Sequence, residues 1–198
     1  DAYILAGGKS ERMGKNKAFL PWHNTTVIEF LYNNLKTIIE KVCVVTKNRD
    51  LFSSMNLKVV YDKHLDYSAI VGIYAALTHS NKNYIFVKAC DNPIFFESLI
   101  YDMYKRLDDY DAVIPKTKDG FHPLFGFYSK RCLKLIGNMI SRQDYRIINL
   151  YEQVKTYFLT EDDITVLDRD KISLKNLNTP EDFREFKRHY EGDKHAYK

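Results

Sequence analysis

Basic residues crowd the stretch that follows the first apolar run of the sequence. Residues 2–5, Ala-Tyr-Ile-Leu, are typical of a short buried strand, and Gly7 and Gly8 come shortly after them. A glycine pair at the end of a strand leaves backbone N–H groups that can close on an anion. Four bases come shortly after the pair and only Glu11 opposes them: Lys9, Arg12, Lys15 and Lys17. The loop should therefore have a positive field that suits a polyphosphate.

Two familiar phosphate loops do not fit this stretch. Residues 8–10, Gly-Lys-Ser, look like the end of a P-loop, but that pattern needs a glycine five residues before Gly8, where Tyr3 stands. The dinucleotide fingerprint G-x-G-x-x-G fails as well, because Gly7 and Gly8 are adjacent and the next glycine is Gly14. The stretch is a phosphate loop of another kind, or an ordinary turn.

A second candidate for chemistry is Asp91. It follows the strand-like run 84–87 and lies in Cys-Asp-Asn-Pro at 90–93. An acidic residue at the carboxyl end of a central parallel strand faces the same edge of the sheet as the glycine pair, where it is well placed to bind a metal ion. An aspartate in this setting is also a common turn or helix cap. The metal-site interpretation depends on the two motifs occurring together.

The elements that position these residues alternate between strand and helix. The apolar periodicity predicts helices over 27–40, 69–79, 96–107 and 129–140, with capping side chains at 24–26 and a further helix start at Thr179. It predicts strands over 2–5, 42–45, 57–61, 84–87, 111–115, 124–128 and 154–159. We therefore expect an α/β fold of three layers, with a mostly parallel twisted sheet and helices on both faces.

Composition excludes several classes of protein. The 198 residues are 45% hydrophobic and 28% charged, as in an ordinary globular chain of one domain. The net charge of +4 comes without a Lys/Arg run, so it favours anionic small molecules over nucleic acid or a membrane surface. The three cysteines lack C-x-x-C spacing, and no apolar run approaches the ~20 residues of a membrane span. Nothing points to export, and we expect a cytoplasmic protein.

The string Leu-x-Gly-Gly-x-Ser-x-Arg-Met-Gly-x-x-Lys over residues 5–17 resembles the nucleoside-triphosphate loop of nucleotidyltransferases that activate small molecules. Within that superfamily it looks most like the MobA family of molybdenum cofactor guanylyltransferases. The family's C-D-x-P string, which carries its Mg²⁺-binding aspartate, is matched at 90–93. The resemblance implies a Rossmann-like nucleotidyltransferase fold and transfer of GMP from GTP to the molybdenum–molybdopterin cofactor, with release of pyrophosphate.

The resemblance also implies roles for individual residues. Catalytic roles fall to Arg12 and Lys17, on the triphosphate, and to Asp91, on Mg²⁺, with Mn²⁺ left open. A larger set would bind the nucleotide: Leu5, Ala6, Gly7, Gly8, Lys17, Thr46, Asp62, Gly72 and Asp91. The family's His-Pro element and its closing Asn-x-Asn-Thr-Pro motif would make His122, Asn176 and Asn178 part of the acceptor site.

The sequence departs from the family pattern in three places. Asn16 replaces an aspartate, Thr46 stands where some members have an asparagine, and residues 68–72 replace a Gly-Pro-Leu-x-Gly turn. The last two departures leave the choice of base open. The alternatives are a cytidylyltransferase acting on the pterin, a sugar-phosphate nucleotidyltransferase, and a nucleotide-binding protein without catalysis.

We expect a single nucleotidyltransferase domain over residues 1–198. Its nucleotide-binding half would span 1–95 and its acceptor-binding half 96–189, with a polar tail at 190–198. The expected partners are GTP and a molybdopterin-type acceptor, with transient contacts to proteins that handle the cofactor. A monomer or a weak oligomer is expected.

Overall fold

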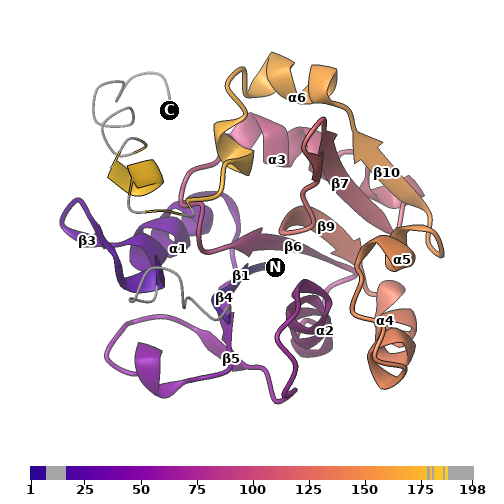
Figure 1. The fold of residues 1–198 in the computed structure, drawn as a ribbon, viewed down its shortest axis with the longest axis horizontal. Coiled ribbons are helices and arrows are strands. Elements are labelled where there is room, and N and C mark those ends of the chain that lie inside the picture. The colour runs from indigo at the N-terminus through magenta and orange to yellow at the C-terminus, as the bar shows by residue number, and fades with distance from the viewer. Residues whose placement is uncertain (8–16, 178, 180, 185, 187–198) are drawn as a thin grey trace.

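A mixed eight-stranded sheet organises the fold (Figure 1). The structure, a computed structural model, describes residues 1–7, 17–177, 179, 181–184 and 186. The strands follow the order β10-β7-β9-β6-β1-β4-β5, with β8 paired to β7. Their bounds are β1 (Ala2–Leu5), β4 (Val42–Thr46), β5 (Val59–Tyr61), β6 (Tyr84–Ala89), β7 (Ala112–Thr117), β8 (Gly120–Phe121), β9 (Phe125–Ser129) and β10 (Thr156–Leu159).

The strand directions decide which loops meet at one edge. β1 pairs in parallel with β4 and β6, and β4 pairs in parallel with β5. β9 is antiparallel to both β6 and β7. Because β9 runs against its neighbours, the loop before it lies at the edge where β6 ends. The mostly parallel sheet is confirmed, and the reversed strand β9 brings the middle of the chain to the carboxyl ends of β1, β4 and β6.

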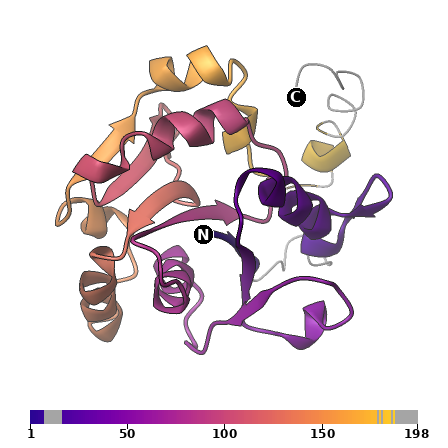
Figure 2. The same ribbon diagram turned by 180° about the vertical axis from the view of Figure 1, so that it is seen from behind.

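Helices cover both faces of the sheet (Figures 1 and 2). One face carries α1 (Val27–Ile38), α3 (Glu97–Tyr104) and α6 (Glu161–Leu167), and the other carries α2 (Ala69–His79), α4 (Cys132–Ser141) and α5 (Ile148–Tyr151). The buried side chains divide in the same way: Leu31, Leu99 and Ile164 belong to one apolar cluster, and Ile70 and Ile136 belong to another. The three-layer architecture is confirmed. In the described part of the chain, no helix is both long enough and apolar enough to span a bilayer.

The start of α1 shows how local chemistry sets an element. Thr26 caps the helix reciprocally, since Glu29 N donates to Thr26 Oγ1 at 3.4 Å and Thr26 N donates to Glu29 Oε2 at 3.1 Å. The residues just before it form a small hairpin of β2 (Pro21–Trp22) and β3 (Thr25–Thr26), which turns through His23 at φ 50°.

Residues 160–174 contain two elements that the periodicity did not predict. α6 has three acidic residues in its first turn and Ile164 as its buried residue, so it carries little apolar pattern. Its start is marked by Thr160, whose Oγ1 accepts from Asp163 N at 3.2 Å. A 3₁₀ turn, η5 (Ile172–Leu174), follows. The cap predicted at Thr179 is confirmed, because Asp182 N donates to Thr179 Oγ1 at 3.0 Å.

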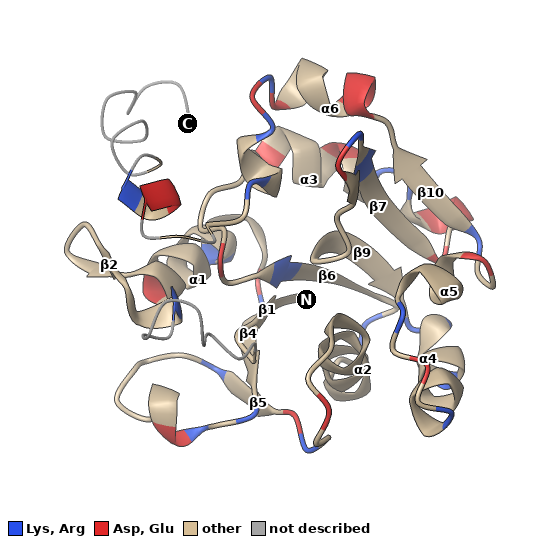
Figure 3. Cartoon of the chain, viewed as in Figure 1, with Lys and Arg blue, Asp and Glu red and all other residues tan. Residues whose placement is uncertain are grey.

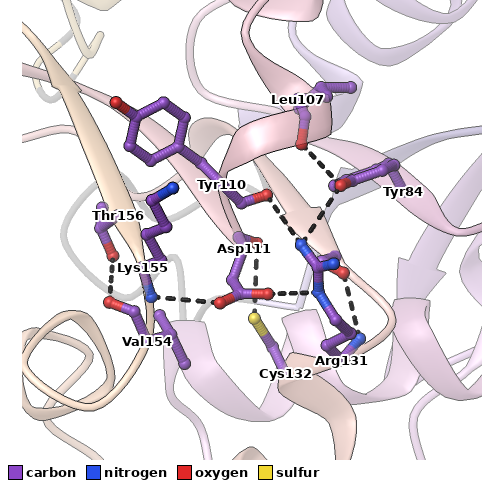
Figure 4. Close-up of polar contacts among 10 residues, drawn as sticks. Tyr84, Leu107, Tyr110, Asp111, Arg131, Cys132, Val154, Lys155 and Thr156 are labelled. Carbon is purple, nitrogen blue, oxygen red and sulfur yellow. Dashed lines mark hydrogen bonds and ion pairs between the residues drawn. The ribbon is translucent and has the colours of Figure 1, made fainter.

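Asp111 ties several elements together at the opposite edge of the sheet (Figure 4). Its carboxylate accepts from Arg131 Nε at 2.5 Å and from the backbone N–H of Lys155 at 3.1 Å. Its backbone carbonyl accepts from Ser129 N at 2.7 Å. The start of β7, the end of β9 and the start of β10 are therefore held through one residue, far along the strands from the candidate site.

We expect Asp111→Ala to lower the free energy of unfolding by about 1–2 kcal/mol, because it removes charge-assisted hydrogen bonds, one of them to the backbone. Arg131→Ala should cost clearly less than Asp111→Ala, because the Arg131 side chain is 61% exposed and water screens its ion pair. Urea unfolding curves measure both, and turnover should not change in either variant. Equal losses of stability would mean that the exposed ion pair, and not the bond to Lys155, holds the strands.

Candidate functional site

The carboxyl ends of β1, β4 and β6 form the floor of the candidate site. Ala6 N donates to Val45 O at 2.9 Å, and Cys90 N donates to Leu5 O at 3.2 Å, so the ladder continues past the ends of the strands. These bonds place residues 5–7 between the end of β4 and the turn that contains Asp91. The predicted residues Gly8 and Arg12 lie outside the described residues.

Gly72 lies below this floor, in the first turns of α2. A Cβ atom at Gly72 would come within 2.8 Å of Leu5 Cδ1, so a larger residue there would have to displace the Leu5 side chain. The contact that the structure gives Gly72 is therefore packing against Leu5. A role for Gly72 in binding the nucleotide stays a prediction, and its packing supports the position of the first residues of the loop.

Asp62 and Thr46 are buried beside residue 7. Asp62 is 5% exposed and accepts from Lys47 Nζ at 2.8 Å and from His64 N at 3.0 Å. Thr46 is 2% exposed, and its Oγ1 accepts from Asn48 N at 3.2 Å. Lys47, whose side chain is the nearest neighbour of Gly7, was not singled out from the sequence, where it reads as part of a polar turn.

Asp91 lies directly beyond β6, and its Oδ1 atom is buried without a hydrogen-bond partner among the described residues. Burial raises the pKa of Asp91, and the positive charge of Lys17, followed by that of Lys88, acts in the opposite direction. Lys17 begins the 3₁₀ turn η2 (Lys17–Phe19). The two sequence motifs are therefore electrostatic neighbours in the folded chain.

The turn that presents Asp91 is bonded to the segment after α6. Asn92 Nδ2 donates to Ile172 O at 2.9 Å, and Asn92 Oδ1 accepts from Ile94 N at 3.1 Å. Leu177 N donates to Asp91 O at 3.0 Å. Asn92 is 2% exposed, so it serves as an internal brace for the turn. No local pattern in the sequence indicates this brace, because its partner is 80 residues away.

The surroundings of Asp91 fit a hard divalent ion bound mainly through a substrate. No group of three or more His, Cys, Asp or Glu side chains gathers in a metal-binding arrangement within the described ranges. Mg²⁺ is commonly held by one or two carboxylates, with substrate phosphates and water completing its shell. A buried carboxylate oxygen without a hydrogen-bond partner among the described residues, close to the charge of Lys17, is the donor that such an ion needs.

A pocket of about 150 Å³ adjoins Asp91. It is lined by Lys88, Ala89, Asp91, Asn92, Phe121, His122, Pro123, Leu124, Phe125, Ser173, Leu174 and Asn176. Two of the three predicted acceptor residues, His122 and Asn176, thus lie beside Asp91, and Asn178 lies outside the described residues. A larger hollow of about 940 Å³, lined by residues of α1, β6 and α3, contains none of the predicted site residues.

His122 reaches the pocket because β9 is antiparallel to β6. Ala89 N donates to Leu124 O at 2.8 Å, which fixes the His-Pro loop against the end of β6. The Nε2 atom of His122 lies 2.9 Å from Thr117 Oγ1. Burial lowers the pKa of His122, which favours a neutral ring at neutral pH. A neutral imidazole hydrogen-bonds without adding a charge to the pocket.

Comparison with known proteins identifies relatives of this chain. A family model described as "MobA-like NTP transferase domain" matches residues 2–156. A molybdenum cofactor guanylyltransferase of Desulfosudis oleivorans is 30% identical over 181 residues, which are 90% of each chain. The crystal structure of molybdopterin-guanine dinucleotide biosynthesis protein A from Archaeoglobus fulgidus superposes with a TM-score of 0.85 at 23% identity, over 96% of this chain and 98% of that one. A Mycobacterium tuberculosis protein solved as a complex with manganese has the same fold, with a TM-score of 0.62 at 14% identity over 94% of this chain and 97% of its own.

Proposed function

The chain belongs to the MobA-like NTP transferase family and is a nucleotidyltransferase, and from this premise we propose that it transfers GMP from GTP to the molybdenum–molybdopterin cofactor. The products would be pyrophosphate and the molybdopterin guanine dinucleotide cofactor. The observation that carries the proposal is the buried, unpartnered Oδ1 of Asp91 beside the charge of Lys17, at the edge where residues 5–7 end.

The chain's own residues would bind and align the triphosphate. The backbone N–H groups at Gly7 and Gly8 would bind the nucleotide. Arg12 and Lys17 would supply positive charge where negative charge grows on the leaving pyrophosphate. Nucleotidyl transfer makes few covalent demands on the protein, so alignment and charge neutralisation account for most of the catalysis. The base and the ribose would lie by Leu5, Ala6, Thr46 and Asp62.

Asp91 would be the protein ligand of the metal ion, which we propose to be Mg²⁺. When bound, the ion would neutralise charge on the phosphates of the nucleotide. The manganese complex of the Mycobacterium tuberculosis structure supports a divalent ion in this fold without deciding between the two metals. The raised pKa of the metal-free Asp91 means that a cation there would relieve an electrostatic cost of the fold.

The acceptor would enter from the side of the pocket that holds His122 and Asn176. Its phosphate then lies next to Asp91, so it can attack the α-phosphorus from the side away from the leaving pyrophosphate. The pocket adjoins Asp91, the residue that would bind the metal ion, and this proximity supports transfer of the nucleotidyl group to an acceptor phosphate.

A panel of nucleotides tests the choice of base. We expect GTP with Mg²⁺ to raise the melting temperature more than ATP, CTP or UTP, because a ligand that binds only the folded state stabilises it by mass action. Differential scanning fluorimetry at equal nucleotide concentrations measures the shift. A larger shift with CTP would favour the cytidylyl alternative. Release of pyrophosphate from GTP only in the presence of the pterin acceptor would exclude a binding protein without catalysis.

A further inference from the structure

Lys88 is a buried lysine in the penultimate position of β6, and it interrupts an otherwise uncharged strand (Figure 3). The residue is 1% exposed, and its side chain lines the pocket beside Asp91. Its Nζ donates one long hydrogen bond, 3.4 Å, to Ser173 O and lies 4.8 Å from the centre of the Phe125 ring. Within the described residues, no carboxylate forms an ion pair with it.

An ammonium group in this environment lacks the partners that usually accompany burial. It has three donors, and the contacts above supply one distant carbonyl and an aromatic face. Burial accordingly lowers the pKa of Lys88 to about 7. The negative charges of Asp91 and Asp168 act in the opposite direction but do not outweigh burial. An anion in the pocket would provide the missing acceptors and favour the charged form.

The surrounding residues hold Lys88 in place without neutralising it. Asp168, itself 1% exposed, accepts from Ile172 N at 2.8 Å and from Ser173 N at 2.7 Å. Its carboxylate is thus engaged by the backbone of η5 and fixes the turn that offers Ser173 O to Lys88. Lys88, which lines the pocket, is therefore left without a carboxylate ion-pair partner among the described residues.

The size of the pocket limits which ligands can reach Lys88. At about 150 Å³ the pocket lies below the ~300–1,000 Å³ of pockets that enclose a whole organic ligand. His122 and Asn176 add polar groups to its wall. A small anionic end group fits, while the rest of the molecule that carries it stays outside.

We propose that Lys88 binds the phosphate monoester of the acceptor and holds it beside Asp91 for attack on the nucleotide. The identity of the acceptor rests on the proposed function, whereas the ligand class, a phosphate monoester, rests on the pocket. In the step that it serves, an acceptor phosphate oxygen forms a bond to the α-phosphorus. The bond from that phosphorus to the bridging oxygen breaks, and pyrophosphate leaves with the electron pair. Lys88 forms no covalent bond and exchanges no proton in this step.

Two substitutions separate the charge from the hydrogen bond. Lys88→Met keeps the length of the side chain and removes the charge, and replacing a buried charge with an apolar group of similar shape is often tolerated by the fold. Lys88→Gln also removes the charge but keeps a donor for Ser173 O. Lys116→Met is the matched control, because Lys116 is an exposed lysine over an aromatic ring, 5.2 Å from the centre of Phe121.

The first measurement is the affinity for inorganic phosphate, by calorimetry, in the presence of Mg²⁺ and an α,β-methylene analogue of GTP. The analogue fills the triphosphate loop and cannot release pyrophosphate, so phosphate reports on the pocket. Both Lys88 variants should bind phosphate at least about tenfold more weakly, the loss of about one charge-assisted hydrogen bond, and Lys116→Met should bind it within about twofold of the parent.

The second measurement is steady-state transfer with the pterin acceptor. The KM for the acceptor should rise by about tenfold or more in both Lys88 variants while the KM for GTP stays within about twofold. Unchanged phosphate affinity in Lys88→Met, or recovery in Lys88→Gln, would overturn the proposal. If Lys88→Met does not fold, Lys88→Gln alone decides. If the protein binds phosphate through Lys88 but transfers no nucleotide to the pterin, the phosphate site stands and only the proposed function is refuted.

Discussion

Asp91→Asn is expected to lower guanylyl transfer by about 10³-fold or more without unfolding the protein. The substitution keeps the size of the side chain but removes the negative charge that a hard divalent cation requires. Losing a single group that stabilises developing charge costs about 10²–10³ in turnover, and here the metal ion and its alignment of the phosphates would be lost together. The measurement is the initial rate of transfer at saturating GTP and Mg²⁺.

The same variant should be at least as stable as the parent when metal and nucleotide are absent. Burial raises the pKa of Asp91, so ionising it weakens the folded state. This cost is fully present above the raised pKa and disappears as the pH falls towards the ordinary value of the unfolded chain, ~3.9. The melting temperature of Asp91→Asn should therefore exceed that of the parent at neutral pH, and the difference should shrink in acid.

Two other carboxylates serve as controls for Asp91. Asp66 is exposed in the loop after β5, so Asp66→Asn should change neither turnover nor melting temperature appreciably. Asp168 is buried and accepts from two backbone N–H groups, so Asp168→Asn should lower the melting temperature. Near-normal turnover in Asp91→Asn would refute the metal assignment. A melting temperature as low as that of Asp168→Asn would show that Asp91 is a structural cap.

The part of the site that could be predicted from sequence is the part that follows from strand direction. Residues 6–7 and Asp91 each follow a strand of a parallel sheet, and the carboxyl ends of such strands share an edge. His122 meets them for a different reason, because β9 runs antiparallel to β6. Strand direction cannot be read from an apolar run, so only the resemblance to a known family indicated that His122 belongs here.

Lys88 and Asn92 could not be predicted, because both depend on partners distant in the sequence. A lysine within a strand usually points to solvent, whereas Lys88 is buried and has Ser173 of η5 as its hydrogen-bond partner. Asn92 has the same dependence on Ile172. The fold itself was predictable over most of its length, since β1, β4, β6 and α2 carry clear periodicity. The short acidic helix α6 and the turn after it carry little.

Lys17→Ala should lower turnover by about 10²–10³-fold and weaken GTP binding, because it removes a positive charge from the leaving pyrophosphate. Lys15→Ala makes the same change of charge two residues earlier, at a position outside the described residues, and it should cost much less. Initial rates and GTP affinities of both variants are the measurement. Equal losses would mean that a diffuse basic field, and not Lys17 itself, holds the triphosphate.

A double-mutant cycle then asks whether Lys17 and Asp91 are neighbours in solution. The charge of Lys17 lowers the pKa of Asp91, so without it the buried carboxylate costs the metal-free fold more. The gain in melting temperature from Asp91→Asn should therefore be larger in the Lys17→Ala background than in the parent, at neutral pH and low salt. The same cycle with Lys15→Ala should show a smaller coupling. Additive effects of Lys17→Ala and Asp91→Asn would mean that the two side chains are not electrostatic neighbours in the metal-free protein.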